Sequence, residues 1–276
     1  MKTIHTLKKV SLATFLTFVL SFSSVFAQND TMYIMKSGAI VGQYNVNTEV
    51  DSVIFYKPTI EETTSGTFID SRDGNEYNWV QIGDQVWMAE NLAYLPSVNM
   101  VADGSEDAAG SYYYVYGYDG TNVADAKATD NYATYGVLYN WTAAMDGEAS
   151  STTNPSGIQG VCPAGWHLPS DAEWTELTDY LGGESVAGGK LKETGTTHWA
   201  SPNTGATNET GFTALPGGNR GIYWAFYTIG NYGYWWSATE SNANNAWDRL
   251  MYCDYSNVTR DGRNKEVGFS VRCVRD

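Results

Sequence analysis

Residues 160–174 read Gly-Val-Cys-Pro-Ala-Gly-Trp-His-Leu-Pro-Ser-Asp-Ala-Glu-Trp, and this stretch predicts where the main helix of the protein begins. Ser170 is suited to the N-cap and Glu173 to the third helical position, so the two can form a reciprocal capping box. Apolar side chains follow at helical spacing, at Trp174, Leu177 and Leu181. Gly182 and Gly183 then provide a C-terminal stop. We therefore expect a helix that starts at 171, packs one face against a core and ends near 181.

Four further motifs stand in fixed order around this stretch. They read Val80-Gln-Ile-Gly-Asp-Gln-Val-Trp-Met-Ala-Glu-Asn-Leu92, Leu215-Pro-Gly-Gly-Asn-Arg220, Trp235-Trp-Ser-Ala-Thr-Glu240 and Gly268-Phe-Ser-Val-Arg-Cys-Val-Arg-Asp276. Together with 160–174 they resemble the Fibrobacter succinogenes major paralogous domain family, which occurs in surface and secreted proteins of Bacteroidetes-type bacteria. The pattern Leu-Pro-Ser-x-x-Glu-Trp is also similar to formylglycine-generating-enzyme-like domains.

The resemblance implies a C-type-lectin-like fold of the α+β class, with short twisted antiparallel strands and few helices. Because that fold presents a variable surface on a rigid frame, the resemblance implies ligand binding and not catalysis. It also implies a disulfide between Cys162 and Cys273, since each lies inside a family-like motif, and this leaves Cys253 as a free thiol. Closing a loop of roughly 110 residues would stabilise the fold by ~4–5 kcal/mol in the chain-entropy model.

The N-terminus has the features of a secretory signal peptide over residues 1–27. Lysines precede an apolar run, and Val25-Phe-Ala27 places small residues at the cleavage site. The alternative, a transmembrane anchor, is disfavoured by the hydroxyl residues within the apolar run. We therefore expect an extracytoplasmic protein, in the periplasm, on the outer surface or secreted, with no transmembrane segment after cleavage.

The mature chain divides into three parts. Residues 28–57 predict a small N-terminal β module of two or three strands, because apolar residues alternate on both sides of a turn region at Lys36-Ser-Gly38. Residues 58–65 are polar and predict a linker. The main domain is expected to span residues 66–276.

Local patterns predict several elements of the main domain. Alternating stretches indicate a meander with turns at Asp73-Gly74 and Gly83-Asp84, and its strands are Thr67–Ser71, Glu76–Ile82 and Gln85–Met88. We interpret residues 103–134 as a long, partly ordered loop and residues 135–145 as a short helix. A terminal strand should alternate, with Phe269, Val271 and Cys273 on one face and Ser270 and Arg272 on the other.

The charge of the chain limits its partners. The sequence has 31 acidic and 16 basic residues, a net charge of −15, which becomes −18 when the three lysines of the signal peptide are removed. Such a polyanion should not bind nucleic acid or an anionic membrane non-specifically. The abundant aromatic residues and glycines fit short strands joined by many turns.

We expect no catalytic residues, no metal site and no cofactor. Calcium-dependent sugar binding needs about six to eight converging oxygen ligands, and Glu240-Ser-Asn242 and Trp247-Asp248 depart from the C-type-lectin motifs. The copper chemistry of formylglycine-generating enzymes needs two soft ligands, and the corresponding region offers only Cys253. His167 is interpreted as a framework residue, and no nucleophile accompanies it or His198. An enzyme remotely related to that group, or a structural subunit of a surface assembly, are the alternatives.

The predicted binding face, within residues 222–264, combines two stretches, an Asn-, Asp- and Tyr-rich tract at 241–266 and an aromatic stretch at 222–236. Such residues offer contact area and adaptable hydrogen bonds, although Asn and Asp are also common in ordinary loops and aromatic residues also fill cores. The arrangement resembles variable proteins of diversity-generating retroelements, which alter residues on the ligand-facing side of a C-type-lectin-like fold. The predicted contacts to a protein or glycan ligand are Tyr223, Trp224, Tyr227, Asn231, Tyr232, Asn242, Asn244, Asn245, Asp248, Tyr252, Asp254, Tyr255, Asn257, Asp261 and Asn264.

Overall fold

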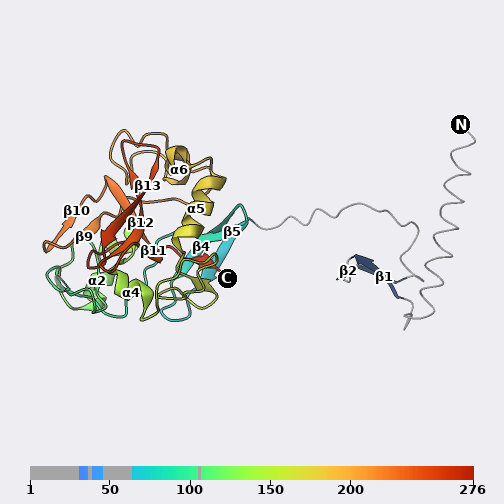
Figure 1. The fold of residues 1–276 in the computed structure, drawn as a ribbon, viewed down its shortest axis with the longest axis horizontal. Coiled ribbons are helices and arrows are strands. Elements are labelled where there is room, and N and C mark those ends of the chain that lie inside the picture. Colours follow the sequence, from blue (N-terminus) through green and yellow to red (C-terminus); the bar gives the residue numbers. More distant parts are fainter. Residues whose placement is uncertain (1–30, 37–38, 46–63, 105–106) are drawn as a thin grey trace, which may run out of the picture. The chain divides into compact units, whose positions relative to one another are not determined.

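The computed structural model of this chain describes residues 31–36, 39–45, 64–104 and 107–276 (Figure 1). They fall into two units, one up to residue 61 and one from residue 62 onward. In the first unit, β1 (Thr31–Lys36) and β2 (Ala39–Asn45) pair as an antiparallel hairpin with a bulge between Ile34 and Met35. The predicted signal peptide, the possible third strand of the N-terminal module and most of the predicted linker lie outside the described residues.

A five-stranded sheet ties the two ends of the second unit together. Its strands are ordered β3 (Ser65–Ile69), β4 (Glu76–Ile82), β5 (Gln85–Met88), β14 (Val274–Arg275) and β8 (Trp166–His167). The first three form the predicted meander, and Gly74 and Gly83 take the positive φ values of 80° and 63° that its turns require. The last strand of the chain therefore lies between the meander and the segment that leads into the main helix.

A second sheet is formed by long neighbouring strands near the C-terminus, β11 (Tyr232–Glu240), β12 (Asn245–Tyr252) and β13 (Val258–Asn264). Two small antiparallel pairs complete the strands: β6 (Tyr113–Tyr114) with β7 (Leu138–Tyr139), and β9 (Asn219–Gly221) with β10 (Ala225–Tyr227). The described chain therefore has an α+β fold built mostly from small antiparallel sheets, as expected.

The helices are short, and the main one begins as predicted. They are α2 (Val123–Lys127), α3 (Asp130–Tyr135), α4 (Trp141–Met145), α5 (Asp171–Tyr180) and α6 (Glu184–Leu191). At α5 the Ser170 hydroxyl accepts the Glu173 N–H at 3.1 Å, and the Glu173 carboxylate accepts the Ser170 N–H at 2.9 Å. The capping box is thus confirmed, and it starts the helix where the sequence indicated.

Two local predictions were wrong. Residues 103–134 are not a loose loop, because β6, α2 and part of α3 lie there and bury Tyr114, Val115 and Ala126. The helix expected over 135–145 begins only at Trp141: Gly136, at φ 73°, ends α3, and Leu138 belongs to a strand. The apolar spacing alone did not distinguish a helix from a strand followed by a helix.

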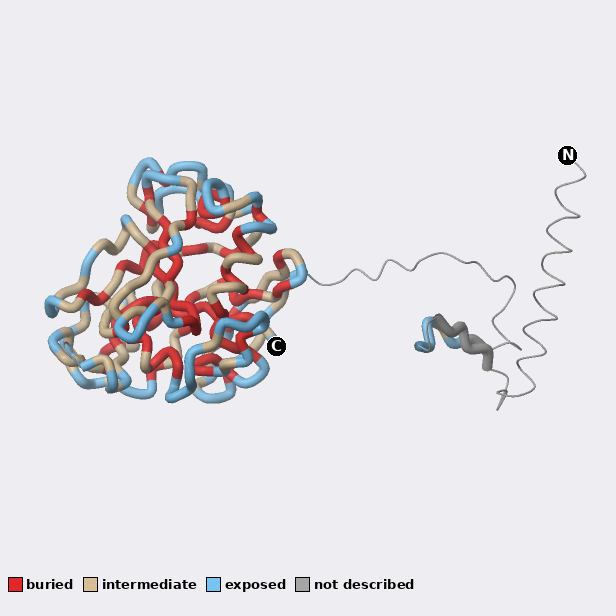
Figure 2. Tube along the Cα trace, viewed as in Figure 1, coloured by how far each residue is buried: buried red, intermediate tan, exposed pale blue. Residues whose placement is uncertain are grey.

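The core consists of two clusters of buried side chains, which Figure 2 shows as the buried interior of the second unit. Neighbouring tryptophans of β11 point to different clusters, Trp236 to the first and Trp235 to the second, because successive side chains of a strand face opposite ways. The C-terminal segment alternates as predicted, with Phe269, Val271 and Cys273 in the first cluster. Ser270 and Arg272 are buried as well, so this segment runs through the interior.

Candidate binding surface

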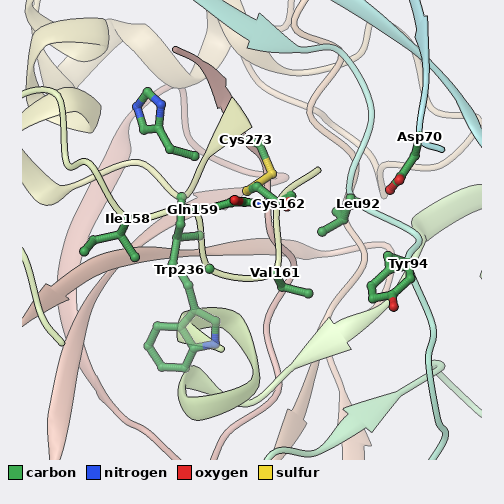
Figure 3. The surroundings of a disulfide bond; sticks show 12 residues. Asp70, Leu92, Tyr94, Ile158, Gln159, Val161, Cys162, Trp236 and Cys273 are labelled. Carbon is green, nitrogen blue, oxygen red and sulfur yellow. Dashed lines mark hydrogen bonds between the residues drawn. A yellow bond between two sulfur atoms is a disulfide. The ribbon is translucent and has the colours of Figure 1, made fainter. Parts of the chain in front are cut away.

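The predicted disulfide is confirmed, and it lies at the centre of the frame that carries the surface. Cys162 and Cys273 are bonded and fully buried, with Leu92 and Trp236 close by (Figure 3). Cys162 lies just before β8 and Cys273 just before β14, so the bond fastens two neighbouring strands of the five-stranded sheet. Cys253 is free and buried.

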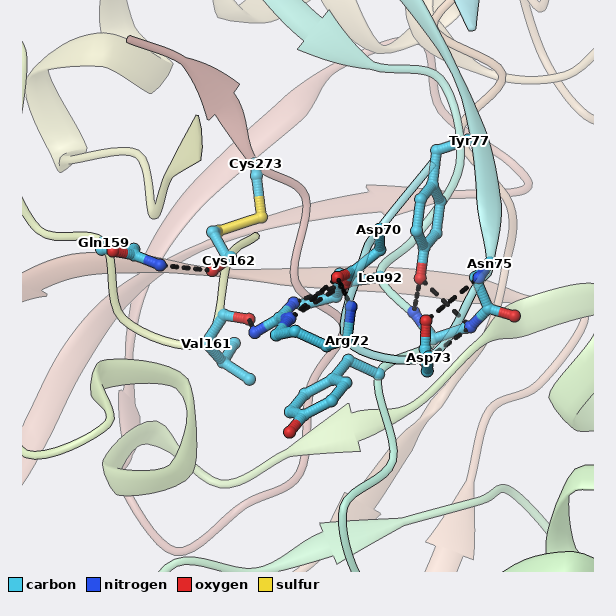
Figure 4. A network of polar contacts seen from close by, with 12 residues as sticks. Asp70, Arg72, Asp73, Asn75, Tyr77, Leu92, Gln159, Val161, Cys162 and Cys273 are labelled. Atoms are coloured by element: carbon cyan, nitrogen blue, oxygen red, sulfur yellow. Dashed lines mark hydrogen bonds and ion pairs between the residues drawn. A yellow bond between two sulfur atoms is a disulfide. The ribbon is translucent and has the colours of Figure 1, made fainter. Parts of the chain in front are cut away.

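A polar network joins the turn after β3 to the segment that contains Cys162 (Figure 4). The Arg72 guanidinium donates to both oxygens of the buried Asp70 carboxylate, at 2.7–3.1 Å, and to the Val161 carbonyl at 2.9 Å. Burial alone would raise the pKa of Asp70, but the hydrogen bonds and charge of Arg72 outweigh it and hold the pKa below its usual value. The turn after β3 is therefore anchored to the residue that precedes the disulfide.

His167 is a framework residue, as its setting in the sequence suggested. Its Nε2 lies 2.6 Å from the buried Glu173 carboxylate, and its Nδ1 lies 2.8 Å from Asp276. Burial alone would lower the pKa of His167, but the contacts with Glu173 and Asp276 raise it above its ordinary value. Glu173, which takes part in the capping box of α5, therefore also binds the imidazole of His167 on β8, and both side chains are buried.

Asn91 joins three of the family-like motifs. Its side-chain oxygen accepts from the indole of Trp235 at 2.9 Å and from the guanidinium of Arg272 at 3.0 Å. Its amide nitrogen donates to the Tyr135 carbonyl and the Ser270 hydroxyl. The buried Asn91 side chain thus has four partners, and the motifs at 80–92, 235–240 and 268–276 meet through it.

Arg220, the last residue of the motif at 215–220, also joins segments that are far apart in the chain. Its fully buried guanidinium donates to the backbone carbonyls of Val101, Asp103 and Glu266. Side chains of the family-like motifs therefore join separate segments of the frame.

The predicted binding residues do not form one cluster. The tract 241–266 enters β12 from one end of the β11–β12–β13 sheet and leaves it at the other. Asn245 pairs with Asn264 at the first end, and Tyr252 pairs with Tyr232 at the second. At ~3.3 Å per residue, these ends are roughly 23 Å apart. Two surfaces therefore replace the single face expected from the sequence.

We call the second of these surfaces the tyrosine end. It comprises Asn231, Tyr232, Tyr252, Asp254, Tyr255 and Asn257, all of them half-buried or exposed. The ring of Tyr252 lies edge-to-face with those of Tyr232, at 5.0 Å, and Tyr255, at 5.8 Å. Tyr255 is 58% exposed. The tyrosine end thus presents tyrosine rings in edge-to-face contact, with amide and carboxylate groups around them.

The other surface, the asparagine end, comprises Asn242, Asn244, Asn245 and Asn264. Here the side chains mainly form local turns: Asn242 accepts the backbone N–H groups of Asn244 and Asn245, and Asn264 accepts that of Glu266. Such bonds are the ordinary reason for asparagine in turns. Asp261, between the two ends, binds the N–H of Gly262 and the guanidinium of Arg263.

The aromatic stretch divides between the core and the surface. Trp235 and Trp236 are fully buried, whereas the predicted contacts Tyr223, Trp224 and Tyr227 are exposed on the β9–β10 hairpin, at 78%, 64% and 41%. We call these three the aromatic hairpin. The chain passes directly from it into the tyrosine end, because the Thr228 carbonyl accepts the N–H groups of Asn231 and Tyr232.

The prediction that Asp248 contacts a ligand at the surface was wrong. Asp248 is fully buried in β12, so it does not contribute to a surface. Neither of its carboxylate oxygens has a hydrogen-bond partner within the described part of the protein. Burial raises the pKa of Asp248 well above its ordinary value. Its place in an Asn- and Tyr-rich tract hid this from the sequence, because the tract runs through a strand whose middle, residues 248–251, is buried on both faces.

Two grooves lie away from the predicted residues. One, of about 560 Å³, lies between the β4–β5 turn and α5 and is lined by Asp84, Glu176, Asp179 and Tyr180 among others. The other, of about 790 Å³, is lined by residues of β3, β4 and α3, including Trp79, Glu90 and Tyr132. No motif indicated either groove, since each combines side chains from elements far apart in the chain.

Residues 31–36, 39–45, 64–104 and 107–276 contain no group of three or more His, Cys, Asp or Glu side chains placed to hold a metal ion. In the same part of the chain, no helix has the length and apolar character needed to cross a membrane.

Comparison with known proteins bears on the frame. No curated protein and no solved structure matched the chain. The family model of the Fibrobacter succinogenes major domain matches residues 80–275, which contain the five motifs except for the last residue of the fifth, Asp276. The protein belongs to the Fibrobacter succinogenes major domain family.

Proposed function

We propose that this protein is an exported binding protein that recognises a protein or a glycan through the tyrosine end. The observation that supports this proposal is a series of neighbouring tyrosine rings that leads from the core to the surface. The ring centroids of the buried Tyr234 and of Tyr232 lie 6.2 Å apart. Tyr232 in turn contacts Tyr252, and Tyr252 contacts the exposed Tyr255. Each ring is thus held by the one beneath it, so the exposed ring loses little freedom when a ligand binds.

Physical chemistry supports this choice of surface. Tyrosine supplies a large contact area with few rotatable bonds, and neighbouring Asn and Asp side chains supply adaptable hydrogen bonds. Asn231, Asp254 and Asn257 surround the rings in this way. The asparagine end is a weaker candidate, because its amide oxygens already bind backbone N–H groups.

The aromatic hairpin would provide a second contact. Trp224 has φ 59°, a conformation that residues with side chains rarely adopt, and it is nevertheless exposed. Backbone strain at an exposed aromatic residue is more common at functional sites than elsewhere. An indole presented in this way can stack on a sugar ring or on a partner's side chain.

The finer parts of the proposal concern location and variation. The buried disulfide supports export, because such bonds persist in oxidising compartments. We also propose a C-type-lectin-like frame and diversification of the tyrosine end by a retroelement. Sequencing of the neighbouring DNA tests the latter. A reverse-transcriptase gene beside a near-copy of the segment coding for 222–272, differing at adenines, is expected, and its absence would remove active diversification from the proposal.

Binding is tested with the mature chain, residues 28–276, on a glycan array and on a panel of purified cell-surface ectodomains. For any partner found, replacing Tyr252 and Tyr255 by alanine should weaken binding by about tenfold or more, the usual effect of removing central aromatic contacts. Tyr180→Ala is the matched control, since Tyr180 is similarly exposed, at 66%, but lies on α5. Equal effects of the two changes would contradict the assignment of the surface.

A further inference from the structure

Lys192, directly after α6, is a buried cation within reach of the tyrosine end. It is fully buried, and its ammonium group donates to three backbone carbonyls: Thr204 at 3.0 Å, Tyr252 at 2.8 Å and Tyr255 at 2.8 Å. Three bonds use the whole donor capacity of an ammonium group. Within the described residues, Lys192 forms no ion pair with a carboxylate.

These carbonyls are the ones that shape the loop of the tyrosine end. Tyr252 ends β12, and Tyr255 lies in the turn that leads to β13. The third carbonyl is that of Thr204, in a separate loop. This loop is hydrogen-bonded to the loop of the tyrosine end, because the Thr204 N–H donates to the Cys253 carbonyl at 2.8 Å. One charge therefore gathers backbone from two loops at a single point.

The helix before Lys192 is shaped to receive the same loop. A Cβ added at Gly188 would lie 2.2 Å from the Asn257 carbonyl oxygen, so only glycine allows the approach. The next residue, Gly189, donates its N–H to the Ser256 carbonyl at 2.9 Å. Two consecutive glycines disfavour a helix, and here they let its backbone touch the loop. The segment Gly188-Gly-Lys-Leu-Lys192 thus packs against residues 252–257 and forms hydrogen bonds with their backbone.

We propose that Lys192 is the positioning residue of the tyrosine end: its ammonium group fixes the backbone of residues 252–255 so that Tyr252 and Tyr255 are presented together. It acts there as a bound cation acts in a carbonyl-lined loop. This inference rests on the proposed function for its purpose, but the ordering of the loop is measurable without a ligand.

In its charged form the amine has three N–H groups, one for each of the three carbonyls. Burial lowers the pKa of Lys192 to about 8, while the Cys253 thiol and the Asp254 carboxylate, both in the loop, act in the opposite direction. On the remaining side the ammonium group faces the ring of Trp199, at 5.3 Å. Because opening the loop would return Lys192 to its ordinary pKa of 10.5, the closed loop binds fewer protons than the open one above about pH 8. Opening should therefore become less favourable, not more, as the pH rises from about 8 to 10.5.

The test is hydrogen exchange of the mature chain, followed in peptides that cover 186–192, 202–206 and 251–257 and expressed as protection relative to the intrinsic rate at each pH. In the wild-type chain, these peptides should be protected at pH 7, and their protection should not fall between pH 7 and 9.5. Lys192→Met should lower their protection about tenfold or more at pH 7, because bonds to a charged group are lost. Lys190→Met, two positions earlier at the end of α6 and more exposed, should leave them unchanged.

Two results would overturn the inference: peptides 251–257 and 202–206 that are unprotected in the wild-type chain at pH 7, or equal effects of the two lysine replacements. If Lys192→Met does not fold, Lys192→Gln, which keeps two N–H donors, is compared with Lys190→Gln in the same way. Failure to find a ligand would count against the proposed function only, since the exchange experiment contains none.

Discussion

Cys162 and Cys273 are joined by a disulfide although 111 positions separate them, and both lie beside strands that are neighbours in one sheet. The bond closes a loop that contains α5, α6 and the whole β11–β12–β13 sheet. Everything proposed to bind a ligand therefore lies within a covalent ring. Its two ends are held in the core, so the loops at the surface can change without loosening the frame.

Removing this bond should lower stability strongly. For the Cys162→Ala, Cys273→Ala double variant, we expect the free energy of unfolding to fall by ~4–5 kcal/mol, the chain-entropy value for so long a loop. Urea unfolding followed by tryptophan fluorescence measures the change. Cys253→Ala, which breaks no covalent bond, is the control and should lower stability by only about 1 kcal/mol. Similar losses in the two proteins would contradict the structural role of the bond.

The contact between His167 and Glu173 predicts a pH dependence. Because the folded-state pKa of His167 is raised, the folded protein binds more protons than the unfolded chain just above pH 6.5. The stabilisation is therefore complete below that pH and is lost as the pH rises through the folded-state pKa. Unfolding free energies at pH 6 and pH 8.5 should show this fall in the wild-type protein.

Glu173→Gln should reduce that fall, since it removes the charge nearest the imidazole. Glu176→Gln, one turn away on the same helix and half-exposed, is the control and should preserve the wild-type dependence. An unchanged profile in Glu173→Gln would mean that another group causes it.

Asn91 should be among the most sensitive polar positions. In Asn91→Ala the indole of Trp235 and the guanidinium of Arg272 both lose an acceptor in a buried setting. We expect a loss of roughly 3 kcal/mol or more, because unpaired buried donors, charged ones above all, are strongly destabilising. Chemical unfolding gives the value. Asn78→Ala, an exposed amide bonded to Glu90, should change stability by less than about 1 kcal/mol.

Gly188→Ala should reverse the usual effect of such a change. Within a helix, alanine is more favourable than glycine by about 1 kcal/mol. Here its Cβ would collide with the Asn257 carbonyl, so we expect a net loss of stability together with faster hydrogen exchange in residues 253–257. Val186→Ala, an exposed position of the same helix, should leave that exchange unaltered. A stabilised Gly188→Ala protein would show that helix and loop are not in close contact.

Asp248→Asn should stabilise the protein at neutral pH. A carboxylate whose folded-state pKa is raised is favourable when protonated, so the wild-type protein should lose stability as the pH rises above about 4. The amide has nearly the same shape and no charge, and it removes this loss. Unfolding measured at pH 5 and pH 7 should give a smaller difference in Asp248→Asn than in the wild-type protein. A lower stability of the variant at pH 7 would argue for an undetected partner of the carboxylate.

Several features could be read from neighbouring residues. The capping box of Ser170 and Glu173 depends on a spacing of three positions, and the turns at Gly74 and Gly83 depend on single glycines. The pairing of Cys162 with Cys273 followed from the resemblance of the surrounding motifs. In each case the information lies within a few residues or within a recognisable family pattern.

The binding surface could be predicted only in part. The sequence correctly marked Tyr255, Trp224 and their neighbours as polar-aromatic and exposed. It joined Asn242 to Tyr255 in one face, because they are close in the chain. The structure separates them, since an eight-residue strand lies between the two loops. The same strand buries Asp248, because the middle of β12 is covered on both faces, and a tract interpreted as a loop does not reveal this.

The sequence by itself determined the family, the start of the main helix and the meander, because these depend on local spacing and composition. Only the tertiary structure decided which of those residues act together. It brought Lys192 beneath Tyr252 and Tyr255, and it brought Asn91 between Trp235 and Arg272. The physical reason is that a buried charge or amide takes whatever partners the packed backbone places within about 3 Å, and that distance is set by the fold of the whole chain.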